Sequence, residues 1–430
     1  MPLEAELPVS LEHVPEQNLF YVLGGREGCL RLASAFYALV PQDPILRPLY
    51  PPRITNCPQH ALAVFLTQFL GGPYDYGDRR WFGSLRAAHQ RFAIGPQERA
   101  AWLATMFLAI DDIQTQEPAR SALRWVFNRA SAYLINQPHE PANAAARPAA
   151  PPPAEQQEGE ESPLQRDIAF RWEAHQMLEQ VMVAIRHQEA DQALRVLESS
   201  VLQDLFRRER AAWLNPLALL SKCKQPILLD YVEHQLTRDP TLVAERYMGD
   251  RTLLHEIAGQ GNVRIVALLL HLGADPNASD GYRQTPLYWV SNAYPYDGAA
   301  RAAVVATLVQ AGANVNARER VKGCSALHMA ARRGNVLVAQ ALLKCGADIE
   351  ARDKYGDTPL HRAVKCRQAE MVAFLLASGA DAQTKSKSGQ TTQQMARGER
   401  IQQVLQASNG VAPGTLTSLA QRQPASEQPA

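Results

Sequence analysis

The chemical role of His89 has to be inferred from the residues around it. His89 lies in the stretch SLRAAHQRFAIG, just before a Gly-Pro pair. An imidazole can titrate, hydrogen-bond or bind a metal ion, although most single histidines have only a structural role. Two other histidines, His13 and His60, precede residue 137. His13 is expected to be exposed and His60 to point away from the apolar stripe of its helix, which leaves few candidates for a metal centre in this part of the chain.

Two tyrosines and a tryptophan could supply hydrogen-bond donors to a ligand near such a histidine. Tyr37 and Tyr50 are thirteen positions apart, and Trp102 follows His89 by the same interval. Phenol and indole groups both donate hydrogen bonds. The alternative is that the three side chains simply pack in a core, as aromatic residues at helical spacing usually do.

Helices must position these residues, and the pattern before residue 137 predicts helices throughout. Apolar residues recur at intervals of three and four in three segments. The segments contain Leu62, Phe65, Leu66 and Phe69; Trp102, Leu103, Met106, Phe107 and Ile110; and Leu123, Val126, Phe127, Ala130 and Leu134. Pro96 suits the first turn of the second helix, and glycine pairs at 24–25 and 71–72 permit tight turns. This region is therefore predicted to be an all-helical domain of about 120 residues.

Length and composition limit the remaining possibilities. A chain of 430 residues is expected to form two or three domains. Lysine and arginine (44) nearly balance aspartate and glutamate (43), so net charge does not favour a nucleic acid or an anionic membrane as a partner. The six cysteines form no C-x-x-C pair, which argues against a disulfide framework or a zinc knuckle. Neither a leader nor an apolar span is recognisable, so we expect a cytoplasmic protein.

Two segments are too polar to fold by themselves. Residues 137–162 are rich in proline, alanine and glutamate and contain no large apolar side chain. Such a composition cannot bury enough apolar surface to offset the entropy of ordering. We therefore predict a disordered linker at 137–162 and a disordered tail at 409–430.

After the linker, a repeated pattern predicts the architecture. The segments TLLH, TPLY, SALH and TPLH begin 33, 40 and 33 residues apart, and each is followed by Gly-Ala-Asp or Gly-Ala-Asn. The pattern resembles ankyrin repeats, which stack into a solenoid with a protein-binding surface. We assign residues 249–408 to repeats with a C-terminal cap, and residues 163–248 to a helical segment with degenerate ankyrin-like units.

Three features of the array invite other interpretations. One histidine recurs in the repeats, at 255, 328 and 361, and could suggest a metal site; the resemblance implies instead a hydrogen bond to its own turn and to the next repeat. Cys324, Cys345 and Cys366 are spaced 21 apart, out of step with the repeat, so they cannot share one face. The second repeat carries seven extra residues around Tyr294 and Tyr296, as either a tolerated insertion or a partner contact.

The region before the linker resembles the group II truncated haemoglobins over residues 17–136. The matching motifs are AFYALVPQDPILRPLYP, FLTQFLGGP, LR..H..FAI and ER.AWL, in family order and spacing. The resemblance implies a two-over-two helical globin domain around haem b. His89 matches the residue that binds the iron, which leaves the opposite face open for O2, CO or NO.

The resemblance also implies roles for other side chains. Tyr37, Tyr50 and Trp102 match the positions that donate hydrogen bonds to the gas. Bound O2 gains negative charge, so such donors stabilise O2 more than CO. Pro58 and Leu62 stand at the ligand gate and cannot donate, and Ala88 replaces a basic residue. The remaining residues assigned to the cofactor are Phe36, Leu62, Phe65 and Phe92 as lining, and Tyr76, Arg79, Arg80 and Arg86 toward the propionates.

Two functions from different classes remain open at this stage. In the first, the chain binds O2 or another diatomic gas reversibly and docks a protein partner through its repeats. In the second, the same haem performs redox chemistry, as a nitric oxide dioxygenase or in a peroxidase-like reaction. The second needs an external reductase, because the sequence shows no flavin or nicotinamide motif. A pure scaffold that has lost its cofactor is a third, less favoured, possibility.

Overall fold

The helices predicted before the linker are present, with turns at the glycine pairs. The computed structural model describes residues 18–50, 56–72, 89–90, 92–137, 162–223, 225–247, 249–293 and 297–407. The elements of the first part are α1 (Leu19–Val22), α2 (Gly25–Leu39), the 3-10 turns η1 (Val40–Gln42) and η2 (Arg47–Leu49), α3 (Asn56–Phe69), α5 (Pro96–Asp112) and α6 (Ala119–Tyr133). Gly24, Gly25 and Gly71 all have φ between +67° and +96°, a backbone conformation that other residues resist.

The apolar stripes of these helices meet in one core. Leu66 on α3, Met106 and Ile110 on α5, and Leu123 and Val126 on α6 are completely buried. Each lies on the face that the spacing of apolar residues predicted. The amphipathic pattern therefore indicates correctly which side of each helix packs inward.

The first helix after the linker belongs to the same core, which was not foreseen from the sequence. Helix α7 (Pro163–Arg186) begins at a capping box formed by Ser162 and Gln165. Its side chains Leu164, Ile168 and Trp172 are in the hydrophobic cluster formed by α2, α3, α5 and α6. The chain accordingly divides into two compact units, one extending to Arg208 and the other beginning at Glu209.

Aromatic contacts show where α7 packs within the first unit. The Trp172 ring lies edge-on to Phe69 at the end of α3, with 6.0 Å between centroids, and to Tyr133 at the end of α6, at 5.7 Å. A Cβ atom at Gly71 would approach the Arg171 guanidinium to 2.7 Å. Helix α7 therefore contacts the C-terminal ends of both α3 and α6. Helices α8 (Ala190–Leu197) and α9 (Ser200–Arg208) complete this unit.

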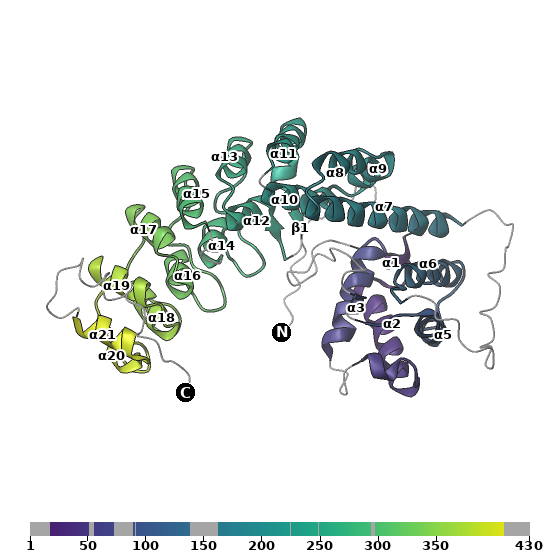
Figure 1. The fold of residues 1–430 in the computed structure, drawn as a ribbon, viewed down its shortest axis with the longest axis horizontal. Helices are drawn as coiled ribbons and strands as arrows, with labels where there is room; N and C mark the ends of the chain where they lie inside the picture. The colour runs from purple at the N-terminus through teal and green to yellow at the C-terminus, as the bar shows by residue number, and fades with distance from the viewer. Residues whose placement is uncertain are drawn as a thin grey trace. The chain divides into compact units, whose positions relative to one another are not determined.

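The second unit is a stack of helix pairs. It begins with η3 (Arg210–Trp213), α10 (Leu214–Lys222), α11 (Pro226–Arg238), η4 (Pro240–Val243) and a short antiparallel pair, β1 (Arg246–Tyr247) and β2 (Arg251–Thr252). The following helices are α12 (Leu253–Gln260), α13 (Val263–His271), α14 (Pro286–Asn292), α15 (Gly298–Gln310), α16 (Ala326–Arg333), α17 (Val336–Lys344), α18 (Pro359–Lys365), α19 (Ala369–Ala377), α20 (Thr392–Met395) and α21 (Glu399–Ala407). Figure 1 shows α12, α14, α16 and α18 in one row and α11, α13, α15 and α17 in the other. No helix among the described residues is long and apolar enough to cross a membrane.

Two of the three repeated histidines, His255 and His328, make both hydrogen bonds that the resemblance implied, whereas His361 makes, among the described residues, only the bond to its own helix start, through Nδ1. The Nδ1 atom of His255 accepts a hydrogen bond from the backbone N–H of Thr252 (3.1 Å), and Nε2 lies 3.1 Å from the carbonyl oxygen of Gln284 in the next hairpin. His328 repeats this arrangement with Ser325 and Asp357. The imidazoles of His255 and His328 therefore each link their own helix start to the following repeat. Tyr294 and Tyr296 lie outside the described residues.

Candidate functional site

Four aromatic residues from three segments of the first unit come together. The Tyr37 ring on α2 lies edge-on to the Tyr50 ring, which follows η2, with centroids 5.7 Å apart. Phe36 contacts both Tyr37 (5.3 Å) and Trp102 on α5 (5.5 Å). Tyr37, Tyr50 and Trp102 were expected together, and the structure places them in one cluster.

The phenols of this cluster are neutral hydrogen-bond donors. Burial raises the pKa of Tyr37 to about 12 and raises that of Tyr50 further, with an added contribution from the neighbouring Tyr37. The neighbouring Trp102 side chain favours the ionised form of Tyr50 and so partly offsets this rise in pKa. Because an indole can only donate, Trp102 can act on the Tyr50 oxygen only as a donor, and the proton of Tyr50 itself stays available. Trp102 thus acts on Tyr50, whereas Tyr50 and Tyr37 can each donate outward.

Most of the residues assigned to cofactor lining stand at the edge of the core, but Phe36 is only 1% exposed and lies inside it. Tyr37, Tyr50, Leu62, Phe65 and Trp102 all pack against the hydrophobic cluster while remaining only partly buried. Pro58, expected at the gate with Leu62, is also half-buried and lies one turn before it on α3. The partly exposed apolar side chains suit contact with a flat apolar group, and the adjacent hydrogen-bond donors suit a polar ligand bound to it. The residues present therefore fit a haem.

The segment that carries His89 is attached to the end of α6 by one asparagine. Asn136 accepts a hydrogen bond at Oδ1 from the backbone N–H of Ile94 (2.9 Å) and donates from Nδ2 to the carbonyl oxygen of Phe92 (2.7 Å). Its own backbone N–H donates to the carbonyl oxygen of Ile94 (3.0 Å), and Nδ2 lies 3.4 Å from that of His89. The segment from His89 to Ile94 is therefore fixed to a helix far away in sequence.

Sequence reasoning missed Asn136, and only a weak signal could have revealed it. An asparagine shortly after a helix end is common because it satisfies free backbone groups locally. Here the side chain instead bonds a segment more than forty residues earlier. Nothing in the motif INQP distinguishes these two uses, so the role of Asn136 becomes visible only in the fold.

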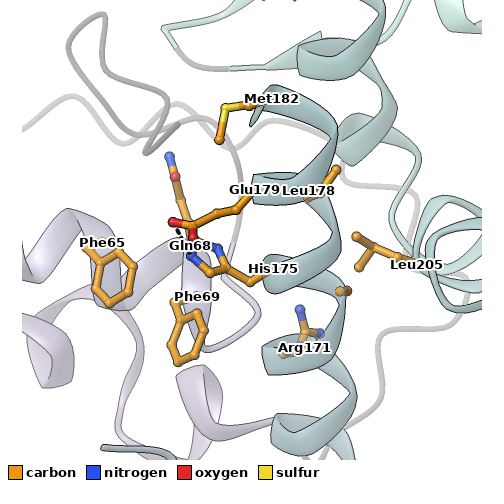
Figure 2. Close-up of a pocket in the computed structure, with 10 residues that line it drawn as sticks. Phe65, Gln68, Phe69, Arg171, His175, Leu178, Glu179, Met182 and Leu205 are labelled. Carbon is orange, nitrogen blue, oxygen red and sulfur yellow. Dashed lines mark ion pairs between the residues drawn. The ribbon is translucent and has the colours of Figure 1, made fainter. Parts of the chain in front are cut away.

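A pocket of about 80 Å³ lies between α3 and α7, and it is distinct from the aromatic cluster. Figure 2 shows Phe65 and Phe69 from α3 facing His175 and Glu179 from α7. Glu179 is almost completely buried and accepts a hydrogen bond from the Tyr133 hydroxyl. Burial lowers the pKa of His175, while the Glu179 carboxylate opposes this shift. The pocket is too small for a cofactor, since such sites usually occupy several hundred Å³.

The remaining predicted residues are placed only in part. Phe92 lies 6.2 Å from the His89 ring, between ring centroids, and both residues are half-buried. Tyr76, Arg79, Arg80, Arg86 and Ala88 lie outside the described residues. The assignment of the first four to the propionates therefore stays a prediction.

Comparisons with known proteins divide the chain in the same order as the motifs. A family model for bacterial-like globins matches residues 18–136, and models for ankyrin repeats match residues 249–281 and 296–386. Group 2 truncated hemoglobin YjbI of Bacillus subtilis is 32% identical over 120 residues, which are 28% of this chain and 90% of that protein.

The relatives of the repeats are matched over much smaller shares of their length. Ankyrin repeat and SOCS box protein 3 of Bos taurus is 35% identical over 127 residues, 28% of this chain and 23% of that protein. Alpha-latrotoxin-Lhe1a of Latrodectus hesperus is 30% identical over 143 residues, 33% of this chain and 10% of that protein. The chain thus spans nearly all of the globin relative but less than a quarter of either repeat protein.

Proposed function

We propose a gas-binding function on the premise that this chain belongs to the truncated haemoglobin family through its first domain. A globin domain indicates ligand binding at haem, and ankyrin repeats indicate interaction with a protein. More finely, we propose that the chain holds haem b through His89, binds O2, CO or NO reversibly, and docks a protein partner on its repeats. A reductase is one such partner, in which case the haem would support redox turnover.

The observation that carries this proposal is the cluster of neutral donors beside half-buried apolar side chains. When bound, haem iron supplies a coordination position for the gas. Tyr37 and Tyr50 remain protonated because burial raises their pKa values. A hydrogen bond from Trp102 to the Tyr50 oxygen would leave the Tyr50 proton for another acceptor. The chain therefore presents polarised O–H groups in an otherwise apolar environment.

His89 would bind the iron from the other side. Its backbone is held through Asn136, which restricts the movement of the segment from His89 to Ile94. A ligand whose backbone is fixed loses less freedom when it coordinates a metal. We infer that Asn136 is a positioning residue for the proximal side.

The decisive experiment is an absorption spectrum of the full chain, purified with haem supplied, in the oxidised, reduced and CO-bound states. We expect a Soret band that shifts when CO is added to the reduced protein. His89→Ala should lose the haem on gel filtration, while His60→Ala should retain it, because His60 is exposed on α3. Circular dichroism of both variants should show that the helices remain folded.

Two results would overturn the proposal. A colourless wild-type chain would exclude a haem function and leave an interaction protein. A six-coordinate ferrous spectrum that CO does not change would exclude gas binding at an open position. Equal haem retention by His89→Ala and wild type would reject His89 as the iron ligand but would leave the proposal of haem binding intact.

A further inference from the structure

In the hairpins between repeats, exposed basic residues alternate along the chain with buried acidic residues. In the hairpin that begins at Arg318, the side chains of Arg318 and Arg320 are exposed while Glu319 between them is buried. The next hairpin repeats the pattern, with Asp353 buried between two exposed basic residues. In extended chain, successive side chains point to opposite sides. The period of two therefore directs the positive charges outward and the negative charges inward.

The inward carboxylates have a structural task that keeps them there. Asp280 accepts hydrogen bonds from the backbone N–H groups of Tyr282 (2.9 Å) and Gln284 (2.8 Å) and from the Trp289 indole (3.1 Å). Glu319 accepts from the N–H of Lys322 (2.6 Å) in the same way. A carboxylate that accepts several hydrogen bonds inside its own turn is held inward, away from the exposed lysines and arginines.

The outer face is consequently positive along four successive hairpins. None of its basic residues forms an ion pair with a carboxylate in the part of the chain that the structure describes, and all of them are exposed. They are Arg283, Arg318, Arg320, Lys322, Arg352, Lys354, Lys385 and Lys387. Within residues 280–285, 318–325, 352–358 and 385–391, the carboxylates are all buried, at Asp280, Glu319, Asp353 and Asp357. Exposed carboxylates stand earlier in the loops, at Asp275, Asp348 and Asp381. The balanced charge of the whole chain hides this local excess.

Three large apolar side chains stand among these positive charges. Tyr282, Val321 and Tyr355 are 54%, 55% and 56% exposed, and each lies at the turn of its hairpin. Single exposed apolar residues are ordinary on protein surfaces. Their recurrence at the corresponding place in three neighbouring hairpins indicates a shared surface.

Backbone hydrogen bonds join the hairpins into one continuous strip. The N–H of Arg320 donates to the carbonyl oxygen of Tyr282 (2.9 Å), that of Lys354 to Lys322 (2.8 Å), and that of Lys387 to Tyr355 (2.9 Å). Each hairpin is thus fixed in position by a backbone hydrogen bond to the preceding hairpin. A preformed surface loses little conformational freedom when a partner binds, which favours recognition.

We propose that this strip, which we call the hairpin surface, binds an acidic polypeptide segment that also carries apolar side chains. The inference rests on the proposed docking role of the repeats and specifies the chemistry of the partner. Carboxylates of the partner would pair with the exposed lysines and arginines, and its apolar side chains would cover the residues at the turns. Val321 offers no flat ring for stacking on a base, so a polypeptide fits the surface better than a nucleic acid does.

The test uses the full haem-loaded chain and defined probes. Fluorescent random copolymer of glutamate and tyrosine is titrated against the chain by anisotropy, beside polyglutamate, a single-stranded oligonucleotide and phosphatidylserine vesicles. We expect the copolymer to bind most tightly, and increasing salt to weaken it without abolishing binding, because the tyrosines of the probe also contact the turns.

Matched variants locate the binding to the hairpin surface. Arg320→Glu, Lys322→Glu and Lys387→Glu combined should weaken copolymer binding by about tenfold or more at low salt. The control combines Lys344→Glu, Arg367→Glu and Arg397→Glu, which changes the net charge equally at exposed residues elsewhere in the array, and it should bind nearly as wild type. Equal loss in both variants would overturn the proposal.

A second variant tests the apolar part. Tyr282→Ser combined with Tyr355→Ser should reduce copolymer binding to the level of polyglutamate, while polyglutamate binding itself changes little. Preference for the oligonucleotide or for vesicles, or no binding of the copolymer, would reject an acidic polypeptide as the partner. The CO spectrum of the same samples reports on the haem proposal separately, so a chain that binds CO but no acidic probe would refute only the hairpin surface.

Discussion

The contacts that stabilise the interior of each unit differ in kind between the two units of this chain. In the repeats, His255 and His328 each link a helix start to the next hairpin, about thirty residues away, and the same bond recurs along the array. In the first unit, single contacts without counterparts join distant segments, such as Asn136 to Phe92 and Trp172 to Phe69. The array is therefore specified by repetition, and the first unit by individual long-range pairs.

This difference determines how much of each unit loses stability when one residue is substituted. A repeat protein is stabilised by each repeat and by its interfaces with the nearest neighbours, so damage spreads only locally. A single core closed by distant segments loses stability as a whole when one of them is disturbed. Substitutions in the two units should therefore differ in how far their effects spread along the chain.

Removal of one ring from α7 should destabilise the first unit alone. Trp172 is 4% exposed and contacts Phe69 and Tyr133, so Trp172→Ala leaves a cavity in the core and should cost about 3–5 kcal/mol of unfolding free energy. Urea unfolding, followed by peptide-resolved hydrogen exchange, measures both units in one sample. Leu360→Ala, in the centre of α18, is the matched core variant in the array. If Trp172→Ala weakens the repeats as much as the first unit, the contrast between the units is wrong.

Acid should instead weaken the array. Burial lowers the pKa of His255 to about 4 and also lowers that of His328, against about 6.5 in the unfolded chain. The unfolded state then binds more protons below pH 6.5, so stability is complete above that pH and falls as the pH approaches 4. For His255 alone the loss is on the order of 3 kcal/mol.

Urea midpoints of the array at pH 7, 5 and 4 measure this loss. His255→Gln removes one titrating group and should flatten the dependence of the midpoint on pH. In the first unit, Glu179 opposes the effect of burial on His175, so the midpoint of that unit should depend less on pH. A steeper dependence in the first unit than in the array would contradict this assignment.

The contrast also explains how much could be predicted from the sequence. Apolar spacing identified the buried faces of α3, α5 and α6, because a helix that packs on one side must show that period. The repeats were visible because each one carries a Thr/Ser-x-Leu helix start and a Gly-Ala pair at a constant distance. Tyr37, Tyr50 and Trp102 were expected together from a family resemblance, and the structure brings their side chains into one cluster.

The sequence could not reveal how α7 packs. Its capping box at Ser162 and Gln165 predicts a helix start, but a helix carries no mark of which domain it joins. The linker before it, residues 137–162, separates α7 from the globin helices in the sequence, and the repeats that follow suggested a different neighbour. Contacts such as Trp172 with Phe69 become apparent only when both partners are placed.

Within the aromatic cluster, the two hydroxyls should contribute separately to gas retention. Each hydrogen bond to a bound polar ligand is worth about 1–2 kcal/mol, so Tyr37→Phe should speed O2 dissociation about tenfold. Tyr50→Phe should have at least this effect. Stopped-flow replacement of O2 by CO measures both rates.

The influence of Trp102 on Tyr50 allows a more specific test. An indole donor that acts on the Tyr50 oxygen should affect O2 only through that hydroxyl. Trp102→Phe should therefore speed O2 dissociation in the wild type but add little in the Tyr50→Phe background. Additive effects would mean that the indole reaches the gas directly.

The smallest effect should come from Asn136. Its side chain makes three hydrogen bonds to His89, Phe92 and Ile94, of which the one to His89 is the longest, while its backbone N–H retains a fourth in any variant. Asn136→Ala should cost about 1–2 kcal/mol at this attachment, with the rest of the core intact. Haem transfer to apomyoglobin should accelerate several-fold, and the iron–histidine vibration of the reduced protein should broaden in resonance Raman spectra.

Asn128 supplies the control for this last variant. It lies on α6 itself, eight residues before Asn136, and accepts hydrogen bonds from Arg99; among the described residues it has no bond to the His89 segment. Asn128→Ala should therefore lower stability by a similar amount without broadening the iron–histidine band. If both variants change the band equally, the attachment at Asn136 only stabilises the fold. If Asn136→Ala alone does so, one side chain at the end of α6 sets the geometry of the proximal ligand, as expected for a unit built from individual long-range pairs.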